Sequence, residues 1–239
     1  MRNPRRLHDH KLLVEKHRLD TQAPAADSLF WRLWQGGGSE LAQKALATGF
    51  VQGIRTGSLD PRSYGAFNVS DIYYCCQGAN DFGDAARRSR DPVLQDFLLH
   101  KQQSYEKYYR VACLEWRLAD PKAVLPSDTA KRYSDFERRL AKGQMEAGKA
   151  ADPIYTLIAM LPCEYLWGWL AQQLSPASDT NLYGPWISSN ACVAGAFAMG
   201  NFIEAYLGNH DLDEGLARHL YLTAMEHEYR NFEGALQQP

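Results

Sequence analysis

Cys163 is the residue whose type and setting best suit chemistry, because it directly follows Pro162 inside a long apolar segment, residues 151–170. A proline inside a helix has no N–H to donate and clashes with the preceding turn, at a cost of about 3 kcal/mol or more. Such a costly bend usually has a reason, and here it would direct a thiol into the space that the bend opens. A thiolate is a strong nucleophile, so this segment offers covalent chemistry as an alternative to the commoner role of a small core side chain.

Two acidic residues far from Cys163 in the chain could assist a nucleophile. Asp71 lies three and four residues before Tyr74 and Cys75, a spacing that places all three side chains on one face of a helix. The alternative for Asp71 is a buried carboxyl group satisfied by tyrosine hydroxyls. Glu228 belongs to the last helical segment, where neighbouring charged residues make a solvated surface an equal alternative.

The elements that must position these residues are predicted to be helices. Asp60-Pro61 and Asp91-Pro92 each combine a capping residue with a proline at the first helical position. No long stretch alternates residues of strong β-preference, so the chain is predicted to be all-α, with a core bundle around a central pocket. Capping and periodicity predict helices over residues 27–34, 61–88, 92–116, 128–140, 152–174, 187–207 and 212–236, with one more opening at Ser39.

Composition limits the possible partners. The chain has 239 residues, 45% of them hydrophobic, which favours one domain at 27–239 preceded by a basic N-terminal arm at 1–26. A formal net charge of -2 gives no field that would attract nucleic acid or an anionic membrane. No run of 18 apolar residues is present, so we expect no membrane partner.

Five cysteines without a Cys-x-x-Cys spacing suit neither a disulfide framework nor a zinc site, and they favour a reducing, cytoplasmic location. His227 lies beside Glu226 and Glu228, but no second histidine stands at the spacing that a helical di-iron site needs. We therefore expect neither a metal nor a cofactor.

Three stretches in order along the chain resemble the TenA family, the thiaminase II or aminopyrimidine aminohydrolase group of the heme-oxygenase-like helical fold. The similarity covers roughly residues 50–235. The stretches are Phe50 to Ile54 and Gly57 to Leu59 with Tyr64, Asp71 and Tyr74 following; Leu161-Pro162-Cys163 with Trp167; and Glu228-Tyr229 with Phe232. The resemblance implies that Cys163 is the nucleophile and that Glu228 transfers protons and holds the pyrimidine.

The same resemblance implies a substrate-binding role for residues from several helices. Asp71 would hold the aminopyrimidine edge, with Tyr74 and Tyr133 completing the polar contacts. The aromatic rings at Phe67, Tyr74, Trp167 and Phe232 could stack on a flat ring, each contact contributing about 1 kcal/mol. Trp167 replaces a tyrosine of many members, and Asn190 stands where an aromatic residue is expected, so these departures reshape the pocket.

The resemblance therefore predicts a cysteine-dependent enzyme of thiamin salvage. It would convert 4-amino-5-aminomethyl-2-methylpyrimidine to the hydroxymethylpyrimidine and ammonia, and could also cleave thiamin. The predicted partner is a small aminopyrimidine or thiamin-related substrate, and the chain is expected to form a homo-oligomer, a dimer or a tetramer. Two alternatives stay open, namely an oxidase of the same helical fold and a non-catalytic module that binds a pyrimidine in a regulatory role.

Overall fold

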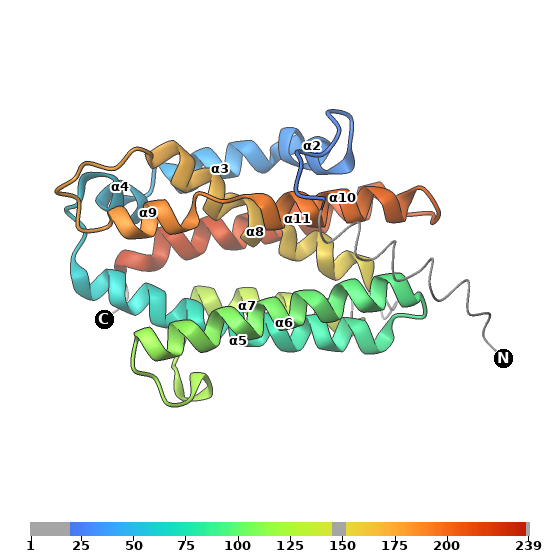
Figure 1. The fold of residues 1–239 in the computed structure, drawn as a ribbon, viewed down its shortest axis with the longest axis horizontal. Coiled ribbons are helices and arrows are strands. Elements are labelled where there is room, and N and C mark those ends of the chain that lie inside the picture. Colours follow the sequence, from blue (N-terminus) through green and yellow to red (C-terminus); the bar gives the residue numbers. More distant parts are fainter. Residues whose placement is uncertain (1–19, 145–151, 238–239) are drawn as a thin grey trace.

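The computed structural model describes residues 20–144 and 152–237, and every regular element within these ranges is a helix (Figure 1). The all-α prediction is therefore confirmed. The α-helices are α2 (Leu29–Leu33), α3 (Ser39–Leu46), α4 (Gly49–Thr56), α5 (Pro61–Arg88), α6 (Pro92–Glu115), α7 (Asp128–Ala141), α8 (Ile154–Leu174), α9 (Gly184–Asn190), α10 (Ala194–Leu207) and α11 (Glu214–Gly234). A π-helical turn, Trp34–Gly38, joins α2 to α3, and short 3-10 turns lie at Pro121–Ala123 and Ala235–Gln237.

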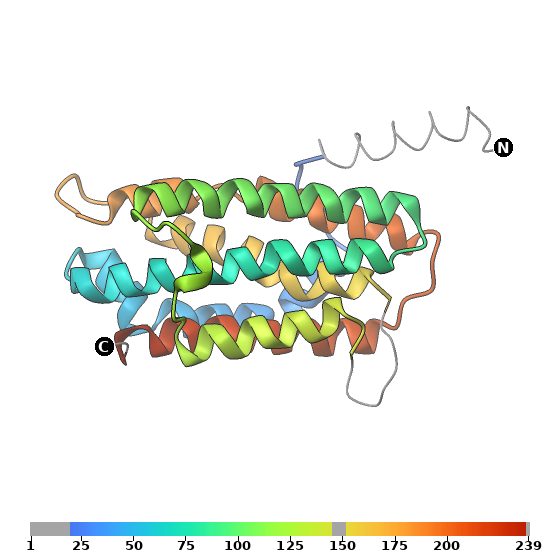
Figure 2. The same ribbon diagram turned by 90° about the horizontal axis from the view of Figure 1, so that it is seen from below.

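The two long helices α5 and α6 begin at the predicted caps. The Asp60 carboxylate accepts a hydrogen bond from the backbone N–H of Arg62 at 2.8 Å. The Asp91 carboxylate accepts from the N–H groups of Val93 and Leu94 at 2.7 and 3.0 Å. Each aspartate satisfies donors that the first turn leaves without helical partners. The two helices then pack along their length, and Figure 2 shows α5 lying between α6 and α7.

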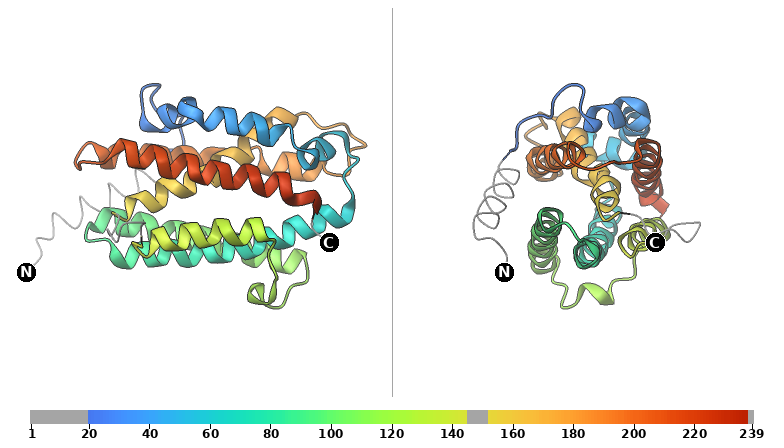
Figure 3. Two further views of the ribbon diagram at one scale, coloured as in Figure 1. Left: turned by 180° about the vertical axis from the view of Figure 1, so that it is seen from behind. Right: turned by 90° about the vertical axis from the view of Figure 1, so that its right-hand side faces the viewer.

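Helix α8 runs through the middle of the bundle, as the end-on view in Figure 3 shows. It is apolar all round, every residue from Ile154 to Pro162 is buried, and it packs mainly against α11 and α10. By length and composition it could cross a membrane, but 78% of the relevant window is buried inside the fold, as expected for a core helix. The helix continues through Pro162, so Cys163 is presented from the centre of the molecule.

The predicted helix over residues 187–207 is wrong, because the chain leaves helical geometry between Asn190 and Ala194 and forms α9 and α10 instead. The reason is a tertiary contact. A Cβ atom at Gly168 of α8 would lie 2.5 Å from Cγ1 of Val193 and 3.4 Å from the carbonyl oxygen of Asn190. The missing side chain at Gly168 lets the 190–193 segment approach α8 closely, which brings Asn190 and Cys192 to the cavity described below.

Only part of the predicted N-terminal arm falls within the described residues, since positions 1–19 lie outside them. Residues 20–26 lie against α10, where the Asn201 side-chain amide donates to the carbonyl oxygens of Asp20 and Gln22. Trp31 of α2 donates from its indole N–H to the carbonyl oxygen of Pro24 at 2.9 Å. This segment brings Thr21 to one end of the cavity.

Candidate active site

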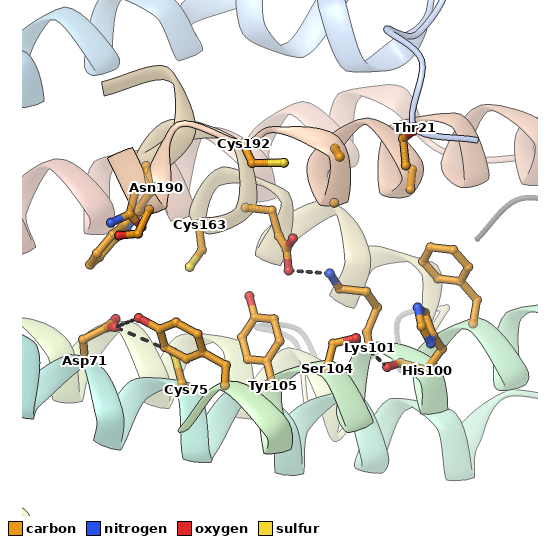
Figure 4. Close-up of a pocket in the computed structure, with 18 residues that line it drawn as sticks. Thr21, Asp71, Cys75, His100, Lys101, Ser104, Tyr105, Cys163, Asn190 and Cys192 are labelled. Carbon is orange, nitrogen blue, oxygen red and sulfur yellow. Dashed lines mark hydrogen bonds and ion pairs between the residues drawn. The ribbon is translucent and has the colours of Figure 1, made fainter. Parts of the chain in front are cut away.

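A cavity of about 420 Å³ lies beside Cys163, walled mainly by α5 and α6 on one side and by α8 and the α9–α10 region on the other (Figure 4). Four predicted site residues line it, namely Asp71, Cys163, Trp167 and Asn190. The Cys163 sulfur points into the cavity in Figure 4. The volume falls in the range of small-molecule sites, and the mixture of aromatic and polar walls is typical of them.

The Cys163 thiol is held in its neutral form. Burial raises the pKa of this thiol well above its ordinary value, and the charges of Glu228, Asp71 and Glu164 raise it further. Because a thiolate surrounded by acids is disfavoured, the thiol can react only if its proton moves to a base as the new bond forms. The surroundings therefore favour a proton transfer that accompanies bond formation over a preformed thiolate.

Glu228 is the acid whose charge most affects Cys163. Its side chain is buried, and the indole Nε1–H of Trp167 donates to its Oε2 atom at 3.2 Å. Burial raises the pKa of Glu228 to about 8, although the hydrogen bond from Trp167 acts in the opposite direction. Glu228 does not line the cavity itself, and Trp167 joins it to the cavity wall. The solvated-surface alternative for Glu228 is thus wrong.

Asp71 lines the end of the cavity that lies away from Lys101 (Figure 4). The Tyr108 hydroxyl donates to Asp71 Oδ2 at 3.2 Å, and the Cys75 thiol donates to the same oxygen at 3.9 Å. Burial raises the pKa of Asp71 to about 7, despite these two hydrogen bonds. Near neutral pH this carboxyl group is therefore present in both protonation states, so it can either donate or accept a hydrogen bond.

Tyr74 and Tyr133 form a buried layer that does not line the cavity. Their rings stack with centroids 4.8 Å apart, and the Tyr74 hydroxyl donates to Oε1 of Glu137 at 2.9 Å. Glu137 is 1% exposed, and burial raises its pKa well above the ordinary value. Within the described part of the chain, the Tyr133 hydroxyl and Glu137 Oε2 have no hydrogen-bond partner. The sequence reasoning missed Glu137, which lies one helical turn after Tyr133.

Phe67 and Phe232 also stand away from the cavity. They are fully buried and pack on Trp167, with ring centroids 5.6 Å apart for Phe67 and 5.5 Å for Phe232. Their observed contacts hold the Trp167 ring in the cavity wall. The remaining predicted residue, Asn190, donates from its side-chain amide to the carbonyl oxygen of Trp186 at 2.8 Å, which fixes its orientation at the cavity.

The largest omission of the sequence reasoning is a buried ion pair between α6 and α8. Lys101 Nζ lies 2.5 Å from Glu164 Oε1, and both residues line the cavity with Tyr105. Leu94, Leu98, Tyr105 and Tyr109 form an apolar stripe at helical spacing along α6, and Lys101 interrupts it. A lysine inside such a stripe was the available signal. Across residues 20–144 and 152–237, no group of three or more histidine, cysteine and acidic side chains is arranged to hold a metal ion.

Solved structures with the same fold come from the TenA family. A TenA family transcription regulator from Silicibacter sp. superposes with a TM-score of 0.75 at 15% identity, over 87% of this chain and 97% of that one. A TenA homologue from P. horikoshii gives a TM-score of 0.72 at 16% identity, over 88% and 99%. A protein described as a TenA-like thiaminase from Sulfolobus solfataricus gives 0.60 at 16% identity, over 85% and 93%.

No protein-family model matches the chain, and no curated protein matches it in sequence. The likeness to solved structures is therefore one of fold. It confirms the TenA resemblance at that level, because the three solved structures named above are TenA proteins or homologues that share this helical arrangement and match over most of their length.

Proposed function

We propose that this protein is a cysteine-dependent aminopyrimidine hydrolase that acts in thiamin salvage. The observation that carries the proposal is the convergence of three groups from α5, α8 and α11. The Cys163 thiol and the Asp71 carboxyl group share one cavity, and the buried Glu228 carboxyl group is the strongest electrostatic neighbour of that thiol. The shared fold with TenA proteins, one of them described as thiaminase-like, supports the same class of substrate.

Asp71 would orient the substrate ring. A 4-aminopyrimidine presents an amino donor next to a ring-nitrogen acceptor, and a carboxyl group can match that edge with its two oxygens. With a pKa of about 7, the Asp71 carboxyl group can either donate its proton to the ring nitrogen or keep it. Trp167 would supply an aromatic face, held from behind by Phe67 and Phe232. A flat, basic ring would thus be fixed in front of the thiol.

Glu228 would move the proton that the thiol must lose. At neutral pH a carboxyl group with a pKa of about 8 is mostly protonated. One of its oxygens would accept the thiol proton while the other donates a proton to the pyrimidine ring, as the sulfur bonds to the adjacent ring carbon. Because Trp167 separates Glu228 from the cavity, the Trp167 ring must shift when the substrate binds so that the carboxyl group can reach the pyrimidine. No net charge develops in this exchange, which suits a buried site of low dielectric constant. The same carboxyl group is neutral before and after the step.

The resulting adduct can expel the group on the methylene carbon. Electrons from the 4-amino group shift through the ring, the carbon–nitrogen bond breaks, and the methylene nitrogen, which is already protonated as an ammonium group, leaves as ammonia. Water then adds to the exposed methylene carbon, and the carbon–sulfur bond breaks to restore the aromatic ring and the thiol. The overall change is substrate plus water to hydroxymethylpyrimidine plus ammonia, so Cys163 is regenerated and no external oxidant or reductant is required.

A direct assay tests this proposal. The purified protein is incubated with 4-amino-5-aminomethyl-2-methylpyrimidine, and separately with thiamin, while ammonia and hydroxymethylpyrimidine are measured. We expect turnover of at least one substrate and its loss in the Cys163→Ser variant, because a hydroxyl is a far weaker nucleophile than a thiol near neutral pH. A matched control is Cys113→Ser, which changes a buried cysteine away from the cavity. Equal rates for wild type and Cys163→Ser would refute the proposal.

A pyrimidine-binding regulatory role is the second candidate. It is favoured by the neutral state of the Cys163 thiol, which is compatible with a binding pocket, and by the description of one structural neighbour as a transcription regulator. Calorimetry with the same pyrimidine distinguishes the two functions. Saturable binding without any ammonia release would support the binding module, whereas turnover that depends on Cys163 would exclude it as the sole function.

A further inference from the structure

The ion pair between Lys101 and Glu164 lies in the cavity wall, on the far side of Cys163 from Asp71 (Figure 4). The side chains are 8% and 14% exposed, and Lys101 Nζ and Glu164 Oε1 are 2.5 Å apart. The Lys101 ammonium also lies 5.6 Å from the centre of the Tyr105 ring. Two opposite charges are thus withdrawn from water at the edge of a ligand-sized space.

Stability alone does not account for this pair. Removing two charges from water costs several kcal/mol per ion, and apolar side chains of similar volume often replace a buried pair without loss of stability. The surroundings are nonetheless shaped to hold Glu164. A Cβ atom on Gly195, in the first turn of α10, would come within 2.9 Å of Glu164 Oε2. The absence of a side chain at Gly195 leaves room for that oxygen beside the cavity.

The position of Glu164 relates it to the chemistry at the neighbouring residue. Glu164 directly follows Cys163 in α8, and both residues line the same cavity. In the proposed reaction the sulfur attacks one ring carbon, and the departing group hangs from a methylene on the next ring carbon. The departing group must therefore lie close to Cys163. Because Asp71 holds the ring at one end, the part of the cavity left for that group is the one that Lys101 and Glu164 border.

We propose that Glu164, held in place by Lys101, forms a subsite for a cationic group on the pyrimidine methylene. This inference deepens the proposed function and rests on it. Glu164 Oε1 is engaged by Lys101, so Oε2 is the acceptor toward the ligand. The hydroxyl of Tyr105, which points into the same space in Figure 4, can accept a second hydrogen bond.

The subsite predicts which substrates the protein selects. A primary amine on the methylene carries a positive charge at neutral pH and would pair with Glu164, whereas the hydroxyl group of the product carries none. Lys101 would restrict the carboxylate to one orientation and repel a cation that approaches from its own side. The class of preferred ligand is thus a 4-aminopyrimidine whose methylene bears an ammonium or another cationic nitrogen group, and the neutral product would be released readily.

Binding to an inactive protein tests the subsite without turnover. Calorimetry on the Cys163→Ser variant compares the aminomethylpyrimidine with the hydroxymethylpyrimidine. We expect the aminomethyl compound to bind about tenfold or more tightly, as a hydrogen bond to a charged group would give. Adding Glu164→Gln should remove that preference and leave the affinity for the hydroxymethyl compound nearly unchanged. Adding Glu106→Gln, which removes an acid outside the cavity, should keep the preference.

A second variant guards against misfolding, because Glu164→Gln leaves Lys101 buried without its counter-charge. The double change Lys101→Met with Glu164→Leu replaces the pair by apolar groups, and its thermal unfolding should resemble that of the parent. It should also lose the preference for the aminomethyl compound. A preference that survives in a folded double variant overturns the subsite while the hydrolase proposal stands. Failure of both pyrimidines to bind the Cys163→Ser protein overturns the proposed function and the subsite together.

Discussion

Glu228 should make the folded protein less stable as the pH rises. Its pKa is about 8 in the folded state against an ordinary value of 4.5, because its carboxyl group is buried. The unfolded chain releases this proton near pH 4.5, whereas the folded chain keeps it until about pH 8. The contribution of the protonated group to stability is therefore complete below pH 4.5 and is lost as the pH rises to about 8. At 1.36 kcal/mol per pKa unit, the loss amounts to roughly 4 to 5 kcal/mol.

The variant Glu228→Gln isolates this effect. Glutamine keeps the shape of the side chain and an oxygen that can accept the Trp167 hydrogen bond, but it does not titrate. Urea unfolding from pH 5 to pH 8.5 should show little difference near pH 5 and a free energy of unfolding that is higher in the variant by about 3 to 5 kcal/mol at pH 8.5. Other buried acids titrate in both proteins, so their effects cancel in the comparison.

The matched control is Glu226→Gln, two residues earlier on α11, where the side chain is 43% exposed and pairs with Arg230. It should follow the wild-type pH dependence within about 0.5 kcal/mol, as surface substitutions usually do. If Glu228→Gln instead shows the same pH slope as the wild type, the carboxyl group is not held protonated in the folded protein. The charge-neutral proton transfer that we assign to Glu228 would then be wrong.

Three further perturbations have defined outcomes. Trp167→Phe removes the hydrogen bond that stabilises the ionised form of Glu228, so the pKa of Glu228 should rise by about one unit or more. The basic limb of the pH–rate profile should move to higher pH by the same amount. An unmoved limb would contradict the hydrogen bond between Trp167 and Glu228. Gly168→Ala forces its new methyl group against Val193 and should cost about 1 to 3 kcal/mol in urea unfolding, with partial recovery when Val193→Ala is added; an unchanged midpoint would refute the close approach. Iodoacetamide at neutral pH should label the exposed Cys192 before any other thiol, as mass spectrometry of peptides would show. Faster labelling of Cys163 would contradict the raised pKa of its thiol.

Local signals predicted much of the helical framework. Asp60 and Asp91 cap α5 and α6 because their carboxylates reach N–H groups only two or three residues away. Such short-range contacts can be predicted from the sequence. The placement of Cys163 in a buried helix could also be predicted from the sequence, because a helix that is apolar all round packs in the core of a protein. The three stretches that resemble TenA proteins then indicated which distant residues to expect near one another.

Contacts across the bundle could not be predicted in the same way. Lys101 and Glu164 are 63 residues apart in the sequence. Only the folded structure, in which α6 and α8 both border the cavity, shows that they pair. The break between α9 and α10 involves a close approach to Gly168 in another helix, and the sequence of the 190–193 segment does not reveal that contact. Glu137 had the ordinary character of a charged residue on an amphipathic helix until the fold placed it beneath Tyr74.

The most direct test of the central claim is a crystal structure of the Cys163→Ser variant with 4-amino-5-aminomethyl-2-methylpyrimidine. We predict the ring inside the cavity, with its aminopyrimidine edge within hydrogen-bond distance of Asp71 and a ring carbon facing position 163. The methylene amine should point toward Glu164. A ring bound elsewhere on the protein, with the cavity beside position 163 occupied only by solvent, would contradict the account.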